Sequence, residues 1–359
     1  MNAPTRPGPY RASAEARALH EGLLVADLHA DSLLWGRDLL ERGDRGHVDV
    51  PRLIQGGVAL QALSASVRVP RHLDLDRNED TTDDVLLLAV GGGWPVRTWR
   101  SPLQRALYLA ARADAMAARS GGRLTIVRTR GELATCLARR RDDPAMTSAI
   151  LTVEGTAPLE GDPANLEVLA DAGFRMLGPT HFVDTPFAGS AHGVAKGGLT
   201  DAGRELVRRA EARSVLIDLA HASSATVDDV LAMATRPVVV SHGGLRSVHD
   251  SVRNLPDAQV RGVAATGGLI GVGFWPAVTG GDDVASIARA ILGAVEVAGL
   301  EHVALGSDFD GAVPVPFDAT GLPQLTEALM AAGLDRDAIA AVMGGNVLRL
   351  LAETLPGAA

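Results

Sequence analysis

The feature that most constrains the fold is an alternation of apolar runs with segments of helical spacing. Eight runs are rich in β-branched and aliphatic residues and have the length of buried strands. They cover residues 23–31, 58–69, 149–155, 174–181, 214–221, 237–244, 268–275 and 302–311. Continuous apolar runs are typical of parallel strands that are covered on both faces. Eight such runs alternating with helices predict an α/β fold, a (β/α)8 TIM barrel, with a doubly wound open sheet as the alternative.

One long segment interrupts this alternation. Residues 70–148 contain a charged stretch, a glycine-rich loop and two helical patterns, around 101–119 and 131–141. We interpret the segment as an insertion after the second predicted strand. Because no repeat of fixed period and no low-complexity linker divides the chain, residues 1–359 are expected to form a single barrel domain.

The composition narrows the range of ligands. The chain has 359 residues, of which 47% are hydrophobic and 21% charged, so it can bury a large core. Its net charge is -9, and its pI is near 5.6. Nucleic acids and anionic membranes both attract basic patches, so this acidic balance argues against either as the partner. A small molecule is the expected ligand.

Three further features predict a cytoplasmic protein. The N-terminal stretch lacks the apolar core of a secretory signal. No segment supplies the roughly 18 uninterrupted apolar residues of a membrane span. The single cysteine, Cys136, excludes an internal disulfide and a metal site built of thiolates alone, which fits a reducing compartment.

Polar side chains stand at the C-terminal ends of six predicted strands. They are His29, Glu154, His181, His221, His242 and Asp308. The strands of a barrel run parallel, so these ends share one rim, where the sites of this fold are assembled. Asp31 follows His29 by two residues and belongs to the same rim.

The donor types in this set suggest a metal-dependent hydrolase. Neutral imidazoles and carboxylates without thiolates suit zinc and neighbouring divalent ions, and one carboxylate can bridge two metals. Two ions about 3.5–4 Å apart can hold a hydroxide and polarise a carbonyl or phosphoryl oxygen.

Six motifs in this order resemble those of the membrane (renal) dipeptidase family, the M19 metallopeptidases, and its bacterial branch in particular. They are DLHADSLLW, HVDVPRLIQGGV, VEG with LEGDPANLEVLADAGFRMLGPTH, GGLTDAGRELV with IDLAHAS, VVVSHGG with RNLPD, and LGSDFDG. The resemblance covers roughly residues 23–350. It implies an amidohydrolase-type (β/α)8 barrel that hydrolyses small dipeptides, often with a D-residue at the C-terminal position. Relatives are commonly dimers, so a homodimer is expected.

The resemblance also implies a role for each rim residue. His29 and Asp31 would bind one zinc ion, Glu154 would bridge two, and His221 and His242 would bind the second. The cofactor is therefore expected to be two Zn²⁺ per chain. A hydroxide bridging them would attack the peptide carbonyl.

Two further roles carried over concern the reaction itself. Asp308 would be the acid/base that takes the proton of the hydroxide and delivers one to the leaving amine. His181 matches the substrate-binding histidine, placed to stabilise the developing oxyanion. Asp310 lies two residues after Asp308, so on a strand both would face the same way and only the resemblance selects Asp308.

Arg253, in the RNLPD motif, matches the arginine of the family's substrate pocket. A guanidinium fork suits the terminal carboxylate of a dipeptide. The alternative for Arg253 is a helix cap or a surface ion pair with Asp250 or Asp257.

The chain departs from the family pattern around the expected pocket. Trp275 stands where a tyrosine is common, which removes a phenolic hydroxyl but keeps an aromatic face. The 182–198 loop is shorter than in the mammalian members, and its His192 could reach over the site. These departures favour a changed side-chain preference.

Two other functions stay open at this point. A related metal-dependent barrel could hydrolyse another amide, a lactone or a phosphoester with the same nucleophile. A non-enzymatic binding protein is the second alternative. Such a descendant would be expected to have lost a rim residue, and none is missing.

Overall fold

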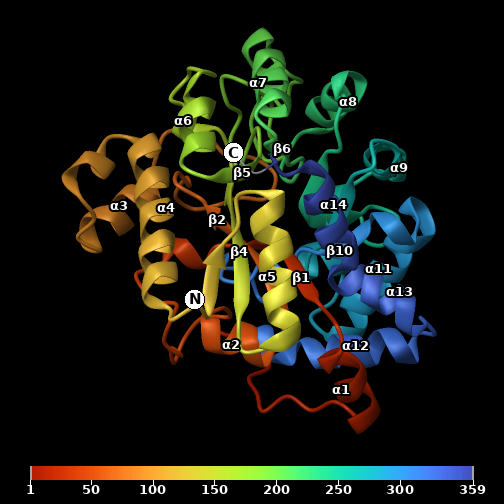
Figure 1. The fold of residues 1–359 in the computed structure, drawn as a ribbon. Helices are drawn as coiled ribbons and strands as arrows, with labels where there is room; N and C mark the ends of the chain where they lie inside the picture. The colour runs from red at the N-terminus through yellow and green to blue at the C-terminus, as the bar shows by residue number, and fades with distance from the viewer. Residues whose placement is uncertain (1, 358–359) are drawn as a thin grey trace.

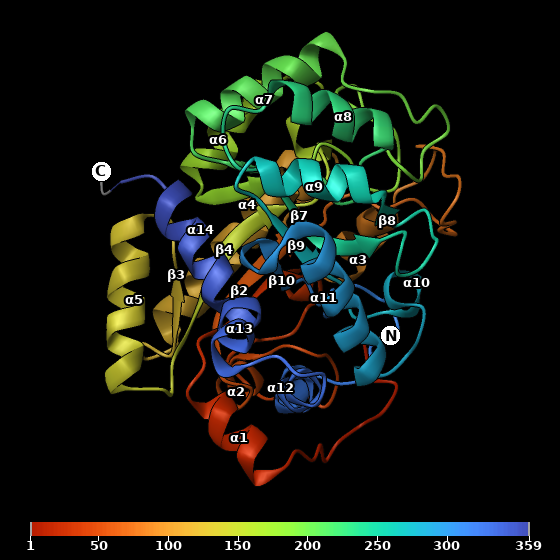
Figure 2. The same ribbon diagram turned by 90° about the vertical axis from the view of Figure 1, so that its right-hand side faces the viewer.

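The structure is a computed structural model, described for residues 2–357, and its parallel strands close into a barrel (Figures 1 and 2). The barrel strands in spatial order are β1 (Val25–Ala30), β2 (Val58–Ala65), β4 (Thr147–Val153), β5 (Phe174–Leu177), β6 (Leu216–Ile217), β7 (Val239–Leu245), β9 (Leu269–Val272) and β10 (Val303–Leu305). β10 pairs with β1, and a parallel bridge between Asp218 and Val239 joins β6 to β7. The predicted TIM barrel is therefore confirmed.

Helices surround the strands on all sides in the two views (Figures 1 and 2). They are α1 (Ala14–Glu21), α2 (Val50–Gln55), α3 (Asp84–Gly91), α4 (Pro102–Arg119), α5 (Arg130–Asp142), α6 (Asn165–Asp171), α7 (Asp201–Ala212), α8 (Ser224–Met233), α9 (Asp257–Ala265), α10 (Pro276–Thr279), α11 (Val284–Ala298), α12 (Leu322–Ala331), α13 (Arg336–Ala340) and α14 (Asn346–Thr354). Side-chain caps start many of them: Thr129 caps α5 with a capping box to Glu132, and Ser223 caps α8.

The barrel is filled by apolar side chains. Ala26 and Leu28 are buried in one apolar cluster with Leu133 of α5 and Leu351 of α14, and this cluster includes residues of all eight barrel strands. Between β1 and its neighbours, Asp27 accepts hydrogen bonds from Gln61 and from Ser307. The polar side chains of the candidate site therefore lie at the strand ends, beyond this apolar packing.

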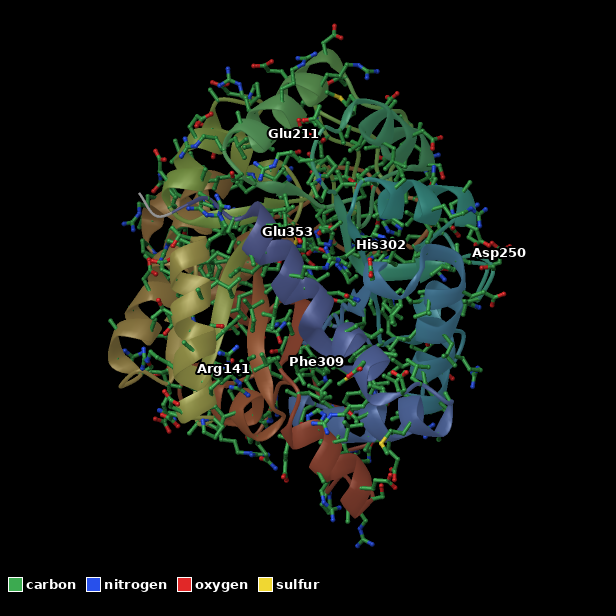
Figure 3. The ribbon with its side chains drawn as sticks, turned by 45° about the vertical axis from the view of Figure 1, so that its right-hand side comes forward. Arg141, Glu211, Asp250, His302, Phe309 and Glu353 are labelled. Atoms are coloured by element: carbon green, nitrogen blue, oxygen red, sulfur yellow. The ribbon has the colours of Figure 1, made fainter. Side chains whose placement is uncertain are left out.

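Figure 3 shows which of its labelled side chains face outward and which are buried. The charged residues Arg141 and Glu353 point outward from α5 and α14, whereas Phe309 is buried inside the fold. His302 lies at the start of β10, where its Nδ1 is 2.9 Å from the carbonyl oxygen of Gly268. Among residues 2–357, no helix is long and apolar enough to cross a membrane.

The 70–148 segment contains more structure than its sequence predicted. The helical patterns around 101–119 and 131–141 correspond to α4 and α5. Two elements were not predicted: α3, and the short strand β3 (Leu124–Ile126). β3 pairs with the first half of β4. Strand β8 (Asn254–Leu255), which pairs with the end of β7, was not predicted either. Three consecutive leucines in α3 give no helical period, and two or three residues are too few to show an alternation.

Several predicted strands are shorter in the structure than the sequence indicated, and two of them are shortened most. The run 214–221 has only the two residues of β6, and the run 302–311 only the three of β10. His221 and Asp308 lie beyond these strands with left-handed backbone, at φ 64° and 58°. β6 ends four residues before His221 and β10 three residues before Asp308, so neither side chain enters the site from a strand.

Candidate metal centre

Glu154 lies at the centre of a buried group of histidines. Its Oε1 is 3.0 Å from His221 Nε2, 3.3 Å from His242 Nε2 and 3.8 Å from His29 Nε2. Its Oε2 is 3.4 Å from His181 Nε2. These residues come from the ends of five different strands, and the barrel brings them together as the sequence predicted.

Two more carboxylates approach the same group from the side of His29. The Nε2 of His29 is 3.6 Å from Asp31 Oδ2 and 4.0 Å from Asp308 Oδ1. Three overlapping sets of donor atoms each lie within 4.8 Å of one another, and two of them share Glu154. They are His29, Glu154 and His242; Glu154, His181 and His221; and His29, Asp31 and Asp308. The arrangement offers neighbouring ion positions around one carboxylate.

Unsatisfied atoms in the cluster fit a bound cation. His29 Nε2, Asp31 Oδ1 and Glu154 Oε2 are buried and have no hydrogen-bond partner among residues 2–357. A buried polar atom without a partner is costly, and native structures rarely leave several together. The donor set is made of nitrogen and oxygen without sulfur, which suits zinc. These residues therefore fit a divalent metal.

The charge balance of the cluster is negative around His29. Burial alone would favour the neutral ring, but Glu154, Asp31 and Asp308 together raise the pKa of His29 to about 10. Burial also raises the pKa of Asp308 well above its ordinary value; His29 opposes this, and Asp31 and Glu154 add to it. Three carboxylates thus crowd one imidazole. A dication would relieve their repulsion.

Three other histidines around Glu154 are held neutral. Burial lowers the pKa of His221 and of His242 well below the usual range, and the positive charge of Arg253 contributes in both cases. Burial likewise lowers the pKa of His181, against the opposing charge of Glu154. A neutral imidazole offers a lone pair, which is the form a metal requires.

The left-handed backbone of His221 and Asp308 is a further mark of a functional site. A residue other than glycine in this region costs about 1–2 kcal/mol. Such strain gathers where a side chain must be aimed at a particular point. The sequence analysis placed both residues on strands, and the structure corrects this.

Asp310 takes no part in the cluster. Its carboxylate accepts hydrogen bonds from Ser32 Oγ at 2.6 Å, from Arg37 Nη2 at 2.5 Å and from the backbone N–H of His47 at 2.7 Å. It therefore anchors the loop after β1. The period-two comparison of Asp308 with Asp310 does not apply, because neither residue lies on a strand.

Arg253 is buried beside the cluster, where the sequence analysis had left a surface role open. It is 4% exposed, and its Nη2 donates a hydrogen bond to the carbonyl oxygen of His242 at 2.6 Å. Its guanidinium lies 5.5 Å from the ring centre of Trp275. Its side chain forms no ion pair with a carboxylate of residues 2–357 within 4.0 Å. A buried cation without a partner anion is ready to receive one.

His192 is fixed at the edge of the site. It is fully buried, and its Nδ1–H donates to the carbonyl oxygen of Leu75 at 2.6 Å. Its ring packs 5.2 Å from Phe182 and 5.1 Å from His221. The 182–198 loop is thereby attached to the 70–148 segment. Sequence reasoning missed Phe182, which also packs against His181 and lines the pocket.

The cluster forms the floor of a cavity of about 480 Å³. One wall consists of four leucines that expose between 38% and 55% of their surface. They are Leu73, Leu75, Leu87 and Leu88. The sequence signal for this wall was the LLL run of α3, which no period explained. The cavity therefore joins a charged floor to an apolar side.

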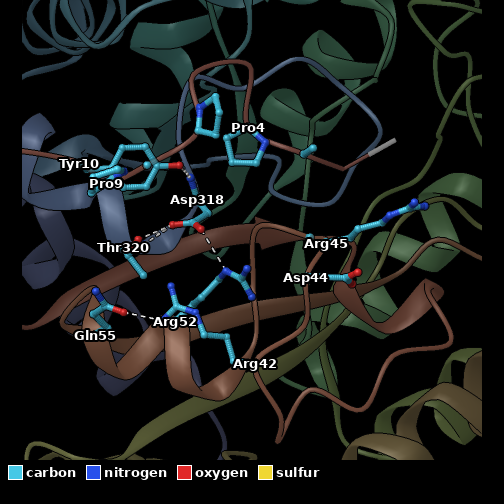
Figure 4. Close-up of a pocket in the computed structure, with 14 residues that line it drawn as sticks. Pro4, Pro9, Tyr10, Arg42, Asp44, Arg45, Arg52, Gln55, Asp318 and Thr320 are labelled. Atoms are coloured by element: carbon cyan, nitrogen blue, oxygen red, sulfur yellow. Dashed lines mark hydrogen bonds and ion pairs between the residues drawn. The ribbon is translucent and has the colours of Figure 1, made fainter.

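A second cavity, of about 470 Å³, lies near the N-terminal segment (Figure 4). In its lining, Arg52 Nε donates to Asp318 Oδ2 at 3.0 Å, and Arg42 Nη1 donates to Gln55 Oε1 at 2.6 Å. Among residues 2–357, none of the three sets of metal-type donors lies in this lining.

Comparison with known families identifies the chain. The family model for the membrane dipeptidases, peptidase family M19, matches residues 13–356. The chain belongs to this family. It is accordingly a hydrolase of a metallo-dipeptidase family, one for which dependence on zinc is characteristic.

Curated relatives of this M19 member are similar at about the same level. An uncharacterized protein of Klebsiella pneumoniae, from the pqqA 5' region, is 31% identical over 250 residues, or 65% of this chain and 90% of the relative. The dipeptidase aclJ of Aspergillus oryzae is 30% identical over 220 residues, or 58% of this chain. That match spans 52% of the fungal protein, about half of its length.

Solved structures of metallopeptidases are similar to most of this chain. A metallopeptidase from Rhodobacter sphaeroides, liganded with a phosphinate mimic of the dipeptide L-Ala-D-Ala, is 26% identical with a TM-score of 0.77. The match covers 92% of this chain and 99% of that one. A structure titled as the family M19 dipeptidase AC is 28% identical with a TM-score of 0.75, over 94% of this chain and 99% of that one.

Proposed function

We propose that this protein hydrolyses small dipeptides with the help of two zinc ions, and that it accepts a D-residue at the C-terminal position. The observation that carries the proposal is the buried, unpaired Arg253 beside a cluster of metal-type donors around Glu154. The cluster supports amide hydrolysis, and the arginine supports a substrate with a free carboxylate. The structure liganded with an L-Ala-D-Ala mimic supports the D-residue.

In this proposal the metal ligands divide around Glu154. His29 and Asp31 would hold one zinc, His221 and His242 would hold the other, and Glu154 would contribute to both. Bound zinc would supply a nucleophilic water at neutral pH and polarise the scissile carbonyl.

Asp308 would carry the proton of the reaction. Its raised pKa suits a group that takes up a proton and gives it to the leaving amine. Its carboxylate lies 4.0 Å from His29 Nε2, so it is next to the proposed metal site.

His181 and Arg253 would hold the substrate. His181 Nε2 lies 3.4 Å from Glu154 Oε2, with its pKa lowered by burial, and as a neutral ring it can donate to the developing oxyanion. Arg253 would bind the terminal carboxylate, and Trp275 keeps the guanidinium in place by packing along it.

The leucine wall would contact an apolar side chain of the substrate. Replacing Leu87, which is 55% exposed, by serine removes apolar surface from the cavity. We expect this variant to lose about 3- to 10-fold in kcat/KM for Leu-containing dipeptides and little for Ala-Ala. Val96→Ser is the matched control, because Val96 is 70% exposed and does not line the cavity. Equal losses with both dipeptides would contradict this role.

The experiment that tests the function combines metal content with a substrate panel. Purified protein is analysed for bound metal and assayed with L-Ala-L-Ala, L-Ala-D-Ala and the C-terminal amide of each, before and after chelation. We expect about two zinc ions per chain, chelator-sensitive cleavage of both dipeptides, and at least 10-fold slower cleavage of the amides. Two zinc ions with cleavage of lactones or phosphoesters, and of no dipeptide, would move the function to the related hydrolase activity.

A further inference from the structure

The junction between β6 and β7 is fastened by a side chain. The carboxylate of Asp218 accepts two backbone hydrogen bonds at Oδ1, from Ser241 at 2.8 Å and from Ala220 at 3.0 Å. Its Oδ2 accepts the hydroxyl of Ser241 at 2.5 Å. Asp218 is also the residue whose bridge to Val239 closes the barrel. One buried aspartate therefore supplies contacts that a longer strand pair would make with its backbone.

The same hydroxyl continues to a proposed metal ligand. Ser241 Oγ lies 2.7 Å from His242 Nδ1. A hydroxyl has one hydrogen, and here it goes to Asp218, so Oγ can only accept from the ring. The ring proton must then sit on Nδ1. The lone pair is left on Nε2, the atom that lies 3.3 Å from Glu154 Oε1.

We propose that Asp218 and Ser241 are positioning residues that hold His242 in its Nδ1–H tautomer and so set the metal affinity of the centre. The inference rests on the proposed metal site. Partners of this kind behind a ligand histidine typically change metal affinity 10- to 100-fold when they are lost.

A second junction in the barrel provides an internal control. Between β1 and β10, Asp27 accepts from the backbone N–H of Ser307 at 2.8 Å and from its hydroxyl at 2.6 Å. The geometry matches that of Asp218 with Ser241. The hydroxyl of Ser307, however, lies 3.1 Å from the backbone carbonyl oxygen of His29 and reaches no imidazole. Loss of the Asp27 carboxylate should therefore weaken the β1/β10 junction without changing the tautomer of a histidine.

Replacing Asp218 by asparagine should reverse the direction of the hydrogen bonds that run from His242 through Ser241 to Asp218. Because two backbone N–H groups need the oxygen at the Oδ1 position, the amide NH₂ will face Ser241 Oγ. The hydroxyl then turns its hydrogen toward His242 Nδ1, and the ring proton moves to Nε2. In that tautomer the atom facing Glu154 is a donor, and the lone pair for a metal is lost.

The test measures tautomer and metal affinity separately from activity. Two-bond ¹H–¹⁵N spectra of the metal-free protein report which nitrogen of His242 carries the proton, and competition with a chelator reports zinc affinity. We expect Asp218→Asn and Ser241→Ala to bind zinc 10- to 100-fold more weakly, and Asp218→Asn to shift the proton of His242 to Nε2. Ser241→Thr keeps a hydroxyl and should stay within about threefold of the parent.

Asp27→Asn is the matched control, and thermal unfolding of each metal-free variant accounts for loss of fold. We expect Asp27→Asn to lower the unfolding temperature about as much as Asp218→Asn does, and to leave the zinc affinity and the His242 signal unchanged. Equal losses of zinc affinity in the two variants, or an unchanged His242 tautomer in Asp218→Asn, would overturn the inference. If the parent protein binds no zinc at all, the proposed function has failed instead.

Discussion

The β6/β7 and β1/β10 junctions are built alike, yet they present different chemistry to the site. In each, a buried aspartate on or directly after one strand binds the backbone N–H and the hydroxyl of a serine on or close after the neighbouring strand. In each, the residue directly after the serine reaches the metal centre. After Ser241 that residue is His242, and after Ser307 it is Asp308. The same hydrogen-bond arrangement therefore orients two different side chains toward the site.

Burial shifts the pKa values of these two side chains in opposite directions. It lowers the pKa of His242 and raises that of Asp308, so in both cases it favours the neutral form. A neutral imidazole is a metal ligand, whereas a carboxyl that readily holds a proton is an acid/base. The junctions also lie close together: a Cβ on Gly306 would be 2.0 Å from the carbonyl oxygen of Ser241, so only glycine fits there.

The largest expected effect separates the two side chains that follow the serines. His242→Ala and Asp308→Asn should each lower kcat/KM for a dipeptide about 1000-fold or more, because each removes a part of the reaction. Only His242→Ala should also lose bound zinc, measured by elemental analysis. Loss of zinc from Asp308→Asn as well would mean that the two junctions do not differ as we infer.

Removal of the metal should also distinguish His242 from Asp308, through the unfolding temperature of their variants. Zinc that binds only the folded state stabilises it by mass action, about 4 kcal/mol at a thousand times Kd. We therefore expect a chelator to lower the unfolding temperature of the parent by several degrees, as followed by calorimetry. The decrease should persist in Asp308→Asn and be much smaller in His242→Ala. An equal decrease in both variants would contradict the assignment of ligands.

A smaller effect is expected at Arg253, which is held by the backbone of β7 at His242. Lysine keeps the positive charge but loses the fork that binds a carboxylate at two points. Arg253→Lys should raise KM about 10- to 30-fold with kcat changed less than about threefold, measured on L-Ala-D-Ala. If kcat falls while KM is unchanged, Arg253 contributes to the reaction at the metal centre and does not bind the substrate.

The smallest effect is a pH dependence on the β6 side. Burial lowers the pKa of His192, which packs on His221, to about 3. The unfolded state binds a proton near pH 6.5, whereas the folded state does not until about pH 3, so stability falls as the pH drops between these values. Between pH 7 and 5 this amounts to about 2 kcal/mol. His192→Gln should lower the pH dependence measured by denaturant unfolding by about this amount, and an unchanged pH dependence would contradict the prediction.

Much of the fold could be predicted because each apolar run carries its own signal. All eight predicted barrel strands exist, and the helical patterns at 101–119 and 131–141 are helices. The errors fall where the local signal is weak or is overridden. β3 and β8 are too short to show a period. The apolar runs of β6 and β10 continue beyond the ends of the strands, up to the left-handed residues His221 and Asp308, and no apolar pattern shows where pairing stops.

The candidate site divides in the same way. The six polar residues at strand ends could be found because parallel strands place their ends on one rim. Arg253 remained ambiguous, since a sequence does not show whether a charged side chain is buried. The roles of Asp218 and Ser241 could not be found at all, because they depend on one hydroxyl hydrogen shared between neighbouring strands.

The sequence by itself determined the barrel, its rim and the donor atoms available there, because alternation and residue type are local properties. Only the tertiary structure decided which donors meet at Glu154, that Arg253 is buried without an ion-pair partner among residues 2–357, and that the Asp310 carboxylate is bound by Ser32, Arg37 and the backbone of His47. The reason is physical: burial and hydrogen-bond partners arise between residues far apart in the chain, and they set the pKa, tautomer and direction of each side chain.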